Sequence, residues 1–500
     1  MDSGAKKPKF SYYFYNPITY VGALLAFFIL GCEILLFGLD FFSENPSVYL
    51  GLVTYLILPP FLILGLILIP IGMRWKRLQV ARGRMEAQPK LLHIDPSKST
   101  HRNAFMVFLI GSTIFLIMTM IGSYRAFQHT ESVQFCGVTC HDLMKPEYTA
   151  YTQSPHARVK CVECHIGEGA GWYVRSKLSG MKQVFNTVEQ KYPRPIPTPV
   201  HNLRPAKETC EQCHWPGKSF SAIELKRTYY PDDPSKSAPW SIRMLMHVSG
   251  QQKHDMGIHA HMYNNNDIFY AADDEKRQKI SWVKSVGKSG QETIYTTKDS
   301  LYKQNPPPAN KIRRMDCMDC HSRPAHNFSA PVPLVNRALN EGQISPNIPM
   351  IKAEAVDVLS KQYASDAQAV QEIRAVLLAY YKEKQAQYYI DHTEQIEDAV
   401  NAVISIYSHN FFPEMKARWD VYPNNIGHLI SEGCFRCHDG EHASFQGAVI
   451  SRDCKSCHTI IEQGTPDALQ RSTEGLEFQH PFEDDGLWKT MNCTDCHTGS

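Results

Sequence analysis

Cysteine pairs followed by histidine recur along this chain and constrain its fold more than any other feature. Six copies have the spacing Cys-x-x-Cys-His, and an earlier, wider copy has three residues between its cysteines. Seven copies with two cysteines each use 14 of the 15 cysteines; the remaining one, Cys32, lies in an apolar segment and is expected to be a small buried hydrophobe. Two thiols and an adjacent imidazole are the groups that attach a c-type haem and bind its iron. The pattern therefore predicts seven covalently bound haems.

Each motif supplies two thioether-forming cysteines and one histidine for the proximal side of the iron. The cysteines are Cys136, Cys140, Cys161, Cys164, Cys210, Cys213, Cys317, Cys320, Cys434, Cys437, Cys454, Cys457, Cys493 and Cys496. The histidines are His141, His165, His214, His321, His438, His458 and His497. Zinc sites tolerate any residue after the second cysteine, and disulfides would leave the histidines unexplained, so haem fits the pattern better than either.

Three apolar runs near the N-terminus predict helices that span a membrane. Residues 17–42, 49–73 and 104–124 each provide the ~20 residues that a hydrocarbon core requires. Residues 74–103 carry eight Lys or Arg residues against two acids, and such short basic loops remain in the cytoplasm. The N-terminus is then cytoplasmic as well, and everything after residue 124 is exported to the periplasm. We expect residues 1–124 to form a transmembrane domain in the bacterial inner membrane.

The exported region divides by the spacing of its motifs. We expect a three-haem domain at 125–220, a fourth-haem segment at 221–330, a helical insert at 331–408 and a C-terminal three-haem domain at 409–500. Alternation of apolar and polar residues at 280–286 and 293–297 predicts a small β element, and helical spacing of apolar residues follows at 352–408. The predicted fold class is a mainly α membrane protein: three transmembrane helices followed by an exported multihaem region with little regular structure.

Histidines outside the motifs are candidates for the distal side of each iron, because two strong axial ligands favour fast electron transfer. Of the 22 histidines, seven lie in motifs and 15 do not. Turn residues that fix an imidazole favour five of them: His259, His261, His326, His428 and His480. The other exported candidates are His156, His201, His247, His254, His409 and His442.

Residues 124–185 resemble the NapC/NirT family of membrane-anchored, quinol-oxidising cytochromes c. A membrane helix runs directly into the first two motifs, and Tyr148, Tyr151, Ser154 and His156 have the family's spacing. The resemblance makes His156 the best distal candidate. With two further spans and four further haems, the whole chain is similar to the seven-haem inner-membrane cytochromes of metal-respiring bacteria. This implies oxidation of menaquinol at the periplasmic face and export of electrons through soluble periplasmic cytochromes.

The first motif departs from the family pattern. In shorter members, a methionine two places after the histidine can replace it as iron ligand, whereas here Met144 stands three places after His141. His141 and Met144 therefore remain alternative ligands of the first iron.

Quinol releases protons as well as electrons, so proton acceptors are expected beside the first motif. The candidates are Arg125, His129 and Glu131 at the end of the third span, and Lys177, Lys182 and Gln183 in the helix after the second motif. Some relatives carry an acid near the position of Gln183, where this chain has an amide. Basic residues at this level also bind lipid headgroups.

These features favour a quinol:cytochrome c oxidoreductase in which electrons enter at the first haem and leave from residues 434–497. Two alternatives are a passive electron-conducting subunit of a quinone enzyme and a terminal multihaem reductase of nitrite or a similar oxyanion. The reductase fits less well because no motif replaces its histidine by lysine. Expected partners are membrane lipid, menaquinol and soluble cytochromes, with no nucleic acid; the sequence is compatible with an oligomer.

Overall fold

The computed structural model of the chain describes residues 12–42, 53–82, 97, 99–139, 141–166, 169–198, 205–214, 222–248, 257–263, 266–287, 289–481 and 486–500. The chain divides into two compact units, Met1–Cys140 and His141–Ser500. The boundary between the units falls inside the first motif.

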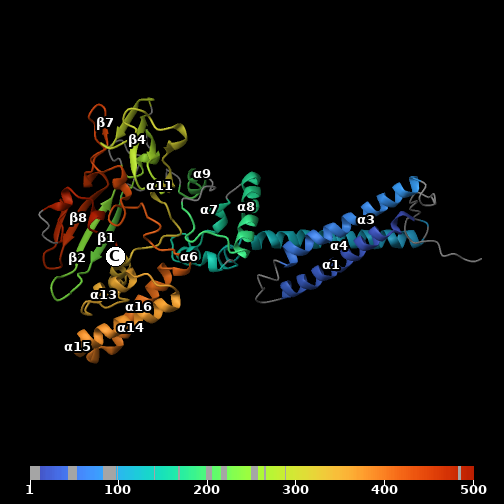
Figure 1. Cartoon of the computed structure of the whole chain (residues 1–500), viewed down its shortest axis with the longest axis horizontal. Coiled ribbons are helices and arrows are strands. Elements are labelled where there is room, and N and C mark those ends of the chain that lie inside the picture. Colours follow the sequence, from blue (N-terminus) through green and yellow to red (C-terminus); the bar gives the residue numbers. More distant parts are fainter. Residues whose placement is uncertain are drawn as a thin grey trace, which may run out of the picture. The chain divides into compact units, whose positions relative to one another are not determined.

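The described part of the first unit is helical (Figure 1). Its elements are the short turns η1 (Tyr12–Phe14) and η2 (Val53–Ile57) and the helices α1 (Pro17–Phe42), α3 (Leu58–Ala81), α4 (Ser99–Thr130) and α5 (Val133–Val138). Among the described residues, two helices are long and apolar enough to cross a membrane, α1 over Pro17–Gly38 and α3 over Leu58–Ala81.

The predicted first span is confirmed as the helix α1, whereas the helix α3 begins and ends later than the second span predicted at 49–73. Helix α3 begins at Leu58, and the two prolines that follow fall in its first turn, where the N–H groups have no helical partner and proline is favoured. It continues to Ala81 because the residues after Met73 include Arg, Lys and Leu, which favour helix. Helix α4 contains the predicted third run, 104–124, and extends beyond it on both sides. Its crossing of the membrane stays a prediction.

Helices α1 and α3 form a closely packed antiparallel pair. A side-chain carbon on Gly65 would lie 2.7 Å from the Ala26 nitrogen and 2.9 Å from the Gly22 carbonyl oxygen. Near the start of α1, the Thr19 hydroxyl donates to the Ile69 carbonyl at 3.2 Å. Small residues at such a crossing allow close backbone packing, which replaces the hydrophobic effect as the attraction between helices in lipid.

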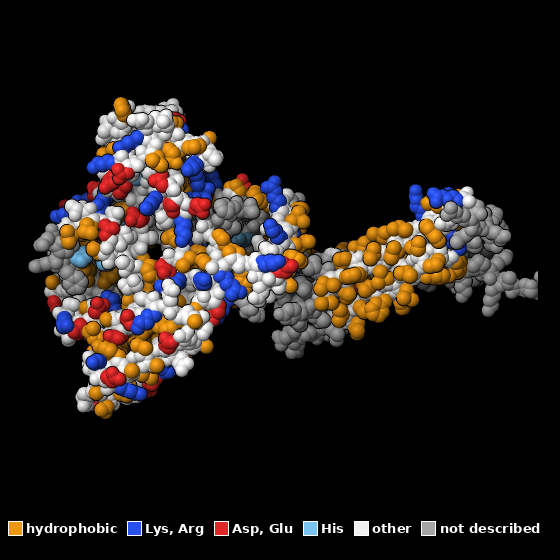
Figure 2. All heavy atoms as spheres, in the orientation of Figure 1, with side chains coloured by type: hydrophobic (Ala, Val, Ile, Leu, Met, Phe, Trp, Pro, Cys, Tyr) orange, Lys and Arg blue, Asp and Glu red, His pale blue; other side chains and the backbone are white. Residues whose placement is uncertain are grey.

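Most other apolar side chains of this pair face outward. Leu24 is 76% exposed and Phe27 is 81% exposed. Figure 2 shows a nearly continuous apolar surface over these helices, unlike the mixed charged surface of the second unit. A surface of this kind is stable only in apolar surroundings, in agreement with a membrane anchor.

The second unit contains eleven helices within its described residues, most of them short. They are α6 (His141–Thr152), α7 (Cys161–His165), α8 (Ala170–Val188), α9 (Ala206–Cys210), α10 (Ala260–Tyr263), α11 (Cys317–Cys320), α12 (Pro331–Asn340), α13 (Ile351–Ser360), α14 (Asp366–Lys384), α15 (Ala386–Asp391) and α16 (Thr393–Asn410). Six 3-10 turns accompany them: η4 (Ala309–Lys311), η5 (Pro413–Met415), η6 (Gly433–Arg436), η7 (Cys454–Ser456), η8 (Leu487–Lys489) and η9 (Cys493–Asp495).

Two antiparallel sheets hold together segments that are distant in the sequence. The four-stranded sheet has the order β1 (Ile223–Tyr229), β2 (Trp240–Met246), β8 (His458–Gly464) and β9 (Gln470–Leu476). The five-stranded sheet has the order β6 (Arg313–Arg314), β3 (Asn266–Ala272), β4 (Ile280–Gly287), β5 (Glu292–Thr296) and β7 (Ala443–Ser444). The β structure is therefore larger than the small element predicted, because strands of 221–330 pair with strands of 409–500.

Helices α12 to α16 contain the largest apolar core of this unit. Ile373 and Leu377 of α14 and Val400 and Val403 of α16 are fully buried in it. Figure 1 shows α14 and α16 side by side. The Ser365 hydroxyl accepts a hydrogen bond from the Gln368 N–H at 3.2 Å and so caps the start of α14. This core is built without motif cysteines.

Replacing Gly65 by valine should force α1 and α3 apart, because the new side chain meets backbone atoms that cannot turn away. We expect a loss of about 1–3 kcal/mol, the usual cost of overpacking. Thermal unfolding of the purified protein in detergent measures it. Gly31→Val on α1 is the control, since no atom lies within 4 Å of the carbon that it would add. Equal melting of the two variants would contradict the close crossing.

Candidate functional site

Six of the seven motifs have their first cysteine in a short helical turn, and the chain at this turn gathers their three functional groups. The turns are α7, α9, α11, η6, η7 and η9. In four of these motifs, the histidine N–H donates to the carbonyl of the first cysteine, for example His214 to Cys210 and His321 to Cys317, both at 2.8 Å. Residues three and four apart on such a turn share one side, so both thiols and the imidazole lie together. In the first motif, Cys136 lies in α5, while Cys140 and the side chain of His141 lie outside the described residues.

Each of the six described motif histidines faces a histidine from outside the motifs. The ring centroids are 5.8 to 6.4 Å apart. The pairs are His165 with His326 (6.2 Å), His214 with His156 (6.0 Å), His321 with His259 (6.3 Å), His438 with His261 (5.8 Å), His458 with His428 (6.4 Å) and His497 with His480 (6.2 Å).

This separation fits one metal ion between two imidazoles. A ligating ring nitrogen lies about 2 Å from a metal, and the ring centroid lies roughly 1 Å further, so two opposed rings stand about 6 Å apart. Ordinary aromatic pairs also fall in the range of about 4.5–7 Å, so a single distance is not specific. Its recurrence at all six described motif histidines is specific.

Hydrogen bonds turn several of these rings so that Nε2 is left for a metal. Nδ1 of His326 bonds the Glu147 carbonyl at 3.0 Å, and Nδ1 of His259 bonds the Val248 carbonyl at 2.8 Å. The same contact joins His156 to Pro324 (3.3 Å), His261 to Ile258 (2.7 Å) and His438 to Ser451 (2.8 Å). A backbone carbonyl accepting from Nδ1–H fixes the tautomer and orientation of a metal-binding imidazole.

Burial keeps most of the paired imidazoles in the neutral form that binds a metal. It lowers the pKa of His458 to about 4, and the neighbouring His428 and His247 lower that pKa further. Burial also lowers the pKa of His165, His261, His321, His326, His428 and His497.

Other sequence candidates have different surroundings. Nε2 of His247 bonds the Thr459 hydroxyl at 2.9 Å. His442 is fully buried, with Nδ1 on the Asp439 carboxylate at 2.9 Å and Nε2 on the Ile280 carbonyl at 3.0 Å. His409 is exposed at the end of α16. None of these three takes part in the six pairs, and His201 and His254 lie outside the described residues.

Successive motifs lie next to one another in space. The thiols of Cys210 and Cys317, in the third and fourth motifs, interact closely enough to raise the pKa of Cys210. Burial raises the pKa of Cys164 in the second motif, and the nearby thiol of Cys213 in the third adds to that effect. The second, third and fourth motifs are therefore neighbours.

The row continues to the last motif. Burial raises the pKa of Cys320 to about 11, with a further contribution from Cys434 of the fifth motif. Burial raises the pKa of Cys457 to about 11, again with a contribution from Cys434. Cys454 of the sixth motif adds to the effect of burial on the pKa of Cys493 in the seventh. Motifs two to seven thus follow one another in space in their sequence order.

The quinol-site candidates fall in both units. Arg125 and His129 lie at the end of α4, with Glu131 just after it, and the His129 ring meets Phe135 edge-on at 5.6 Å. Nε2 of His129 is buried without a hydrogen-bond partner among the described residues. Lys177, Lys182 and Gln183 lie on α8 of the second unit. Met144 lies on α6.

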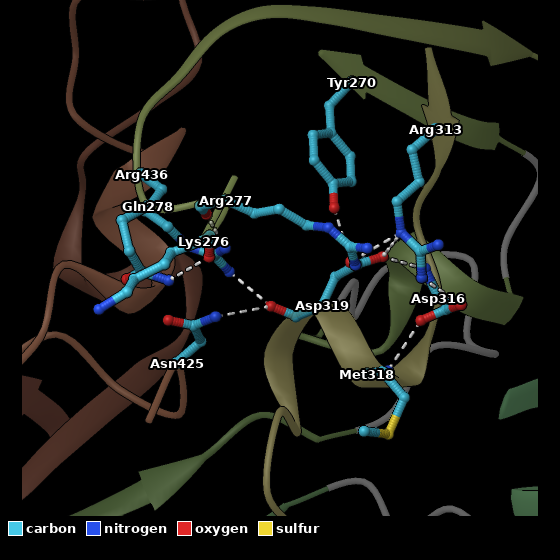
Figure 3. Close-up of polar contacts among 10 residues, drawn as sticks. All are labelled: Tyr270, Lys276, Arg277, Gln278, Arg313, Asp316, Met318, Asp319, Asn425 and Arg436. Carbon is cyan, nitrogen blue, oxygen red and sulfur yellow. Dashed lines mark hydrogen bonds and ion pairs between the residues drawn. The ribbon is translucent and has the colours of Figure 1, made fainter. Parts of the chain in front are cut away.

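A buried polar network joins the fourth motif to the fifth, and the sequence patterns did not single it out. Figure 3 shows the Asp319 carboxylate enclosed by Tyr270, Arg277 and Arg313. The Tyr270 hydroxyl donates at 2.6 Å, Arg313 Nε at 3.0 Å and Arg277 Nη1 at 3.3 Å. Arg436 of the fifth motif donates to the Asp319 carbonyl at 2.6 Å. An acid between two haem-motif cysteines is the only local signal, since its partners come from distant strands and loops.

Comparisons with known proteins agree with these features. The NapC/NirT cytochrome c family, N-terminal region, matches residues 98–195. Over 489 residues, 97% of this chain and 95% of the relative, the chain is 41% identical to the cytochrome c-type protein ImcH of Geobacter sulfurreducens. Over 144 residues, 28% of this chain and 80% of the relative, it is 24% identical to the cytochrome c-type protein NrfH of Wolinella succinogenes. No solved structure matches the chain significantly.

The chain belongs to the NapC/NirT family of multihaem cytochromes c and is of the ImcH type. It is therefore a membrane-anchored electron-transfer protein with covalently bound haem.

Replacing Asp319 by asparagine should destabilise the second unit, because two guanidinium groups lose their shared counter-charge in a buried site. The Asp319 side chain is 2% exposed and its arginine partners about one third, so we expect the lower end of the range for broken buried ion pairs, about 3 kcal/mol. Asp267→Asn is the control: its surface pair with Arg314 is worth about 0–1 kcal/mol. Thermal unfolding followed by circular dichroism should separate the variants, and equal loss would contradict the role of the network.

Proposed function

We propose that this protein is a menaquinol dehydrogenase of the bacterial inner membrane that passes electrons through seven c-type haems to soluble periplasmic cytochromes. The observation that carries the proposal is the row of six imidazole pairs, each joining one motif histidine to one histidine from elsewhere. Bound haem supplies reversible one-electron chemistry at each position of the row. The residues of this chain hold those positions close together and in a fixed order.

In this proposal, the two imidazoles of each pair would together hold one iron. The ligands cross between motifs: His156, which precedes the second motif, pairs with the third, and His326, which follows the fourth, pairs with the second. Such crossing ties neighbouring motifs to one another. Six filled pairs also leave no open iron at motifs two to seven for an oxyanion substrate, which favours electron transfer over a terminal reductase at those motifs.

Electrons are proposed to enter at the first motif. Cys136 follows six residues after the end of α4, which we take as a third membrane span with the exported region on its periplasmic side. His129 lies beside this motif in the first unit, and its buried Nε2, which bonds no other described residue, is suited to accept a proton from quinol. His141, or Met144 in its place, is the proposed iron ligand there.

Helix α8 supports a position of the exported region on the bilayer surface. Its residues Val174, Leu178, Met181, Phe185 and Val188 recur at helical spacing, and each is more than half exposed. Arg175, Lys177 and Lys182 lie on the same helix, with the aromatic residues Trp172 and Tyr173 at its start. An exposed apolar stripe with basic neighbours is typical of a helix in the membrane interface. Lys177, Lys182 and Gln183 would then face the quinol-bearing layer.

Electrons are proposed to leave from the fifth to seventh motifs, at the other end of the row that begins with the second motif. Soluble cytochromes approach such haems in brief encounters that are steered by charge. Reduction of the partner is therefore expected to slow as salt is raised.

Loss of Cys136 tests both the haem count and the entry point. Wild-type protein should contain seven haems by intact mass and pyridine haemochrome, and Cys136→Ala should contain six. The variant should no longer be reduced by a menaquinol analogue, although dithionite reduces its remaining haems. Cys32→Ala is the matched control and should keep seven haems and full quinol oxidation. Six haems in the wild type would refute the loaded first motif, and quinol reduction of the variant would refute entry there.

The sixth motif offers a sharp test of the ligand pairs, because two histidines lie near His458. His428→Gln should convert one haem from low-spin to high-spin, since glutamine does not replace the axial imidazole. His247→Gln should leave every haem low-spin, since the His247 ring is bonded to Thr459. Low-temperature magnetic circular dichroism counts the high-spin centres. A high-spin haem in the His247 variant alone would reverse the proposed assignment.

A further inference from the structure

A single arginine of the fifth motif makes hydrogen bonds to the surroundings of the fourth motif. Arg436 lies between Cys434 and Cys437, its side chain is buried, and its guanidinium donates three hydrogen bonds to backbone carbonyls. Nε donates to Gly433 at 2.8 Å, Nη1 to Arg277 at 2.8 Å and Nη2 to Asp319 at 2.6 Å. Gly433 belongs to the fifth motif's own turn, while the other two carbonyls belong to the surroundings of the fourth.

The carbonyl that Arg436 reaches is itself held in place. Asp319 lies between Cys317 and Cys320, and its side chain accepts from Tyr270 and Arg313 at 2.6 and 3.0 Å. The amide of Asn425 donates to the same carbonyl at 3.2 Å. A rigid bridge thus runs from β3 and β6, through the fourth motif, to the turn η6 of the fifth (Figure 3).

We propose that Arg436 is a positioning residue that fixes the fifth haem against the fourth and so sets the rate of electron transfer between them. The inference rests on the proposed function in taking this pair of haems as successive steps of the electron path. The contact joins residues 117 positions apart in the chain, so no local structure replaces it.

The geometry requires arginine rather than any cation. A guanidinium offers five donors in a planar fork and can serve three carbonyls at once, whereas the lysine ammonium is a point charge on a flexible stem. Lysine at 436 would therefore keep the charge and lose the fixed geometry. Because small misplacements of reacting groups slow transfer steeply, we expect about a tenfold slower step.

Two variants separate position from charge: Arg436→Lys keeps the charge and Arg436→Gln removes it. The full-length protein in nanodiscs is mixed rapidly with a menaquinol analogue, and haem reduction is followed by absorbance. Wild type should be reduced in one phase. Both variants should show a second phase about tenfold slower, whose amplitude corresponds to the three haems after the link. Arg314→Lys, on the same strand as Arg313 but at the surface, should behave as wild type.

Each outcome has a definite meaning. A slow phase in the glutamine variant alone would show that charge rather than position matters and would overturn the proposal. Absence of a slow phase in both variants would overturn it as well. Failure of quinol to reduce the wild type would instead refute the proposed function.

If quinol does not reduce the wild type, the positioning role of Arg436 can still be tested by a measurement that does not use quinol. Pulsed magnetic resonance of the oxidised protein measures the coupling between the fourth and fifth haems, which should be broadened in both Arg436 variants and unchanged in Arg314→Lys. If the Arg436 variants do not assemble, Tyr270→Phe removes one hydrogen bond to Asp319 while keeping the ring. It should give the same broadening to a smaller extent, and an unbroadened coupling would overturn the proposal.

Discussion

The separation of about 6 Å between paired imidazole rings is the constraint on which the second unit depends. Each motif turn presents one imidazole, but the second ring of every pair comes from a loop or, for His261, the short helix α10 elsewhere in the chain. The remaining structure can be understood as the frame that carries these second rings. The pairing of β2 with β8 brings residues near His247 to the sixth motif, and the Val248 carbonyl orients His259. Regular structure is sparse around the motifs because single turns suffice there.

Much of this arrangement could be predicted from local sequence. The first apolar run is the helix α1, and the alternating segment at 280–286 is the strand β4, which ends one residue later. The six non-motif histidines that the sequence favoured, His156 by resemblance and five by their turn residues, are the six found in the pairs. Turn residues were informative because a loop with a fixed backbone can hold an imidazole at a set angle. Their role as iron ligands stays a prediction.

The pairings themselves could not be predicted, because they depend on contacts between distant segments. Nothing near His326 indicates that it faces His165 rather than the motif that it follows. The same limit applies to the strands of 221–330 and 409–500, which share both sheets. The contact between Arg436 and Asp319 could not be predicted for the same reason. The two residues lie in different motifs, and only the folded chain brings them together.

The crossed histidine pairs have a consequence for assembly. In the proposed ligation, the second motif receives its other axial ring only after residue 326 has crossed the membrane, long after the motif itself has emerged. Haem attached early in export would wait with one coordination position unfilled, and completion of the early positions would depend on the later segments. Maturation would then proceed in two steps. Haem would be attached covalently in the order of synthesis, and the second imidazole would bind each iron only after the chain has folded. A chain whose export stopped before residue 326 would carry covalently attached haem at its second motif but would lack the second imidazole for that haem.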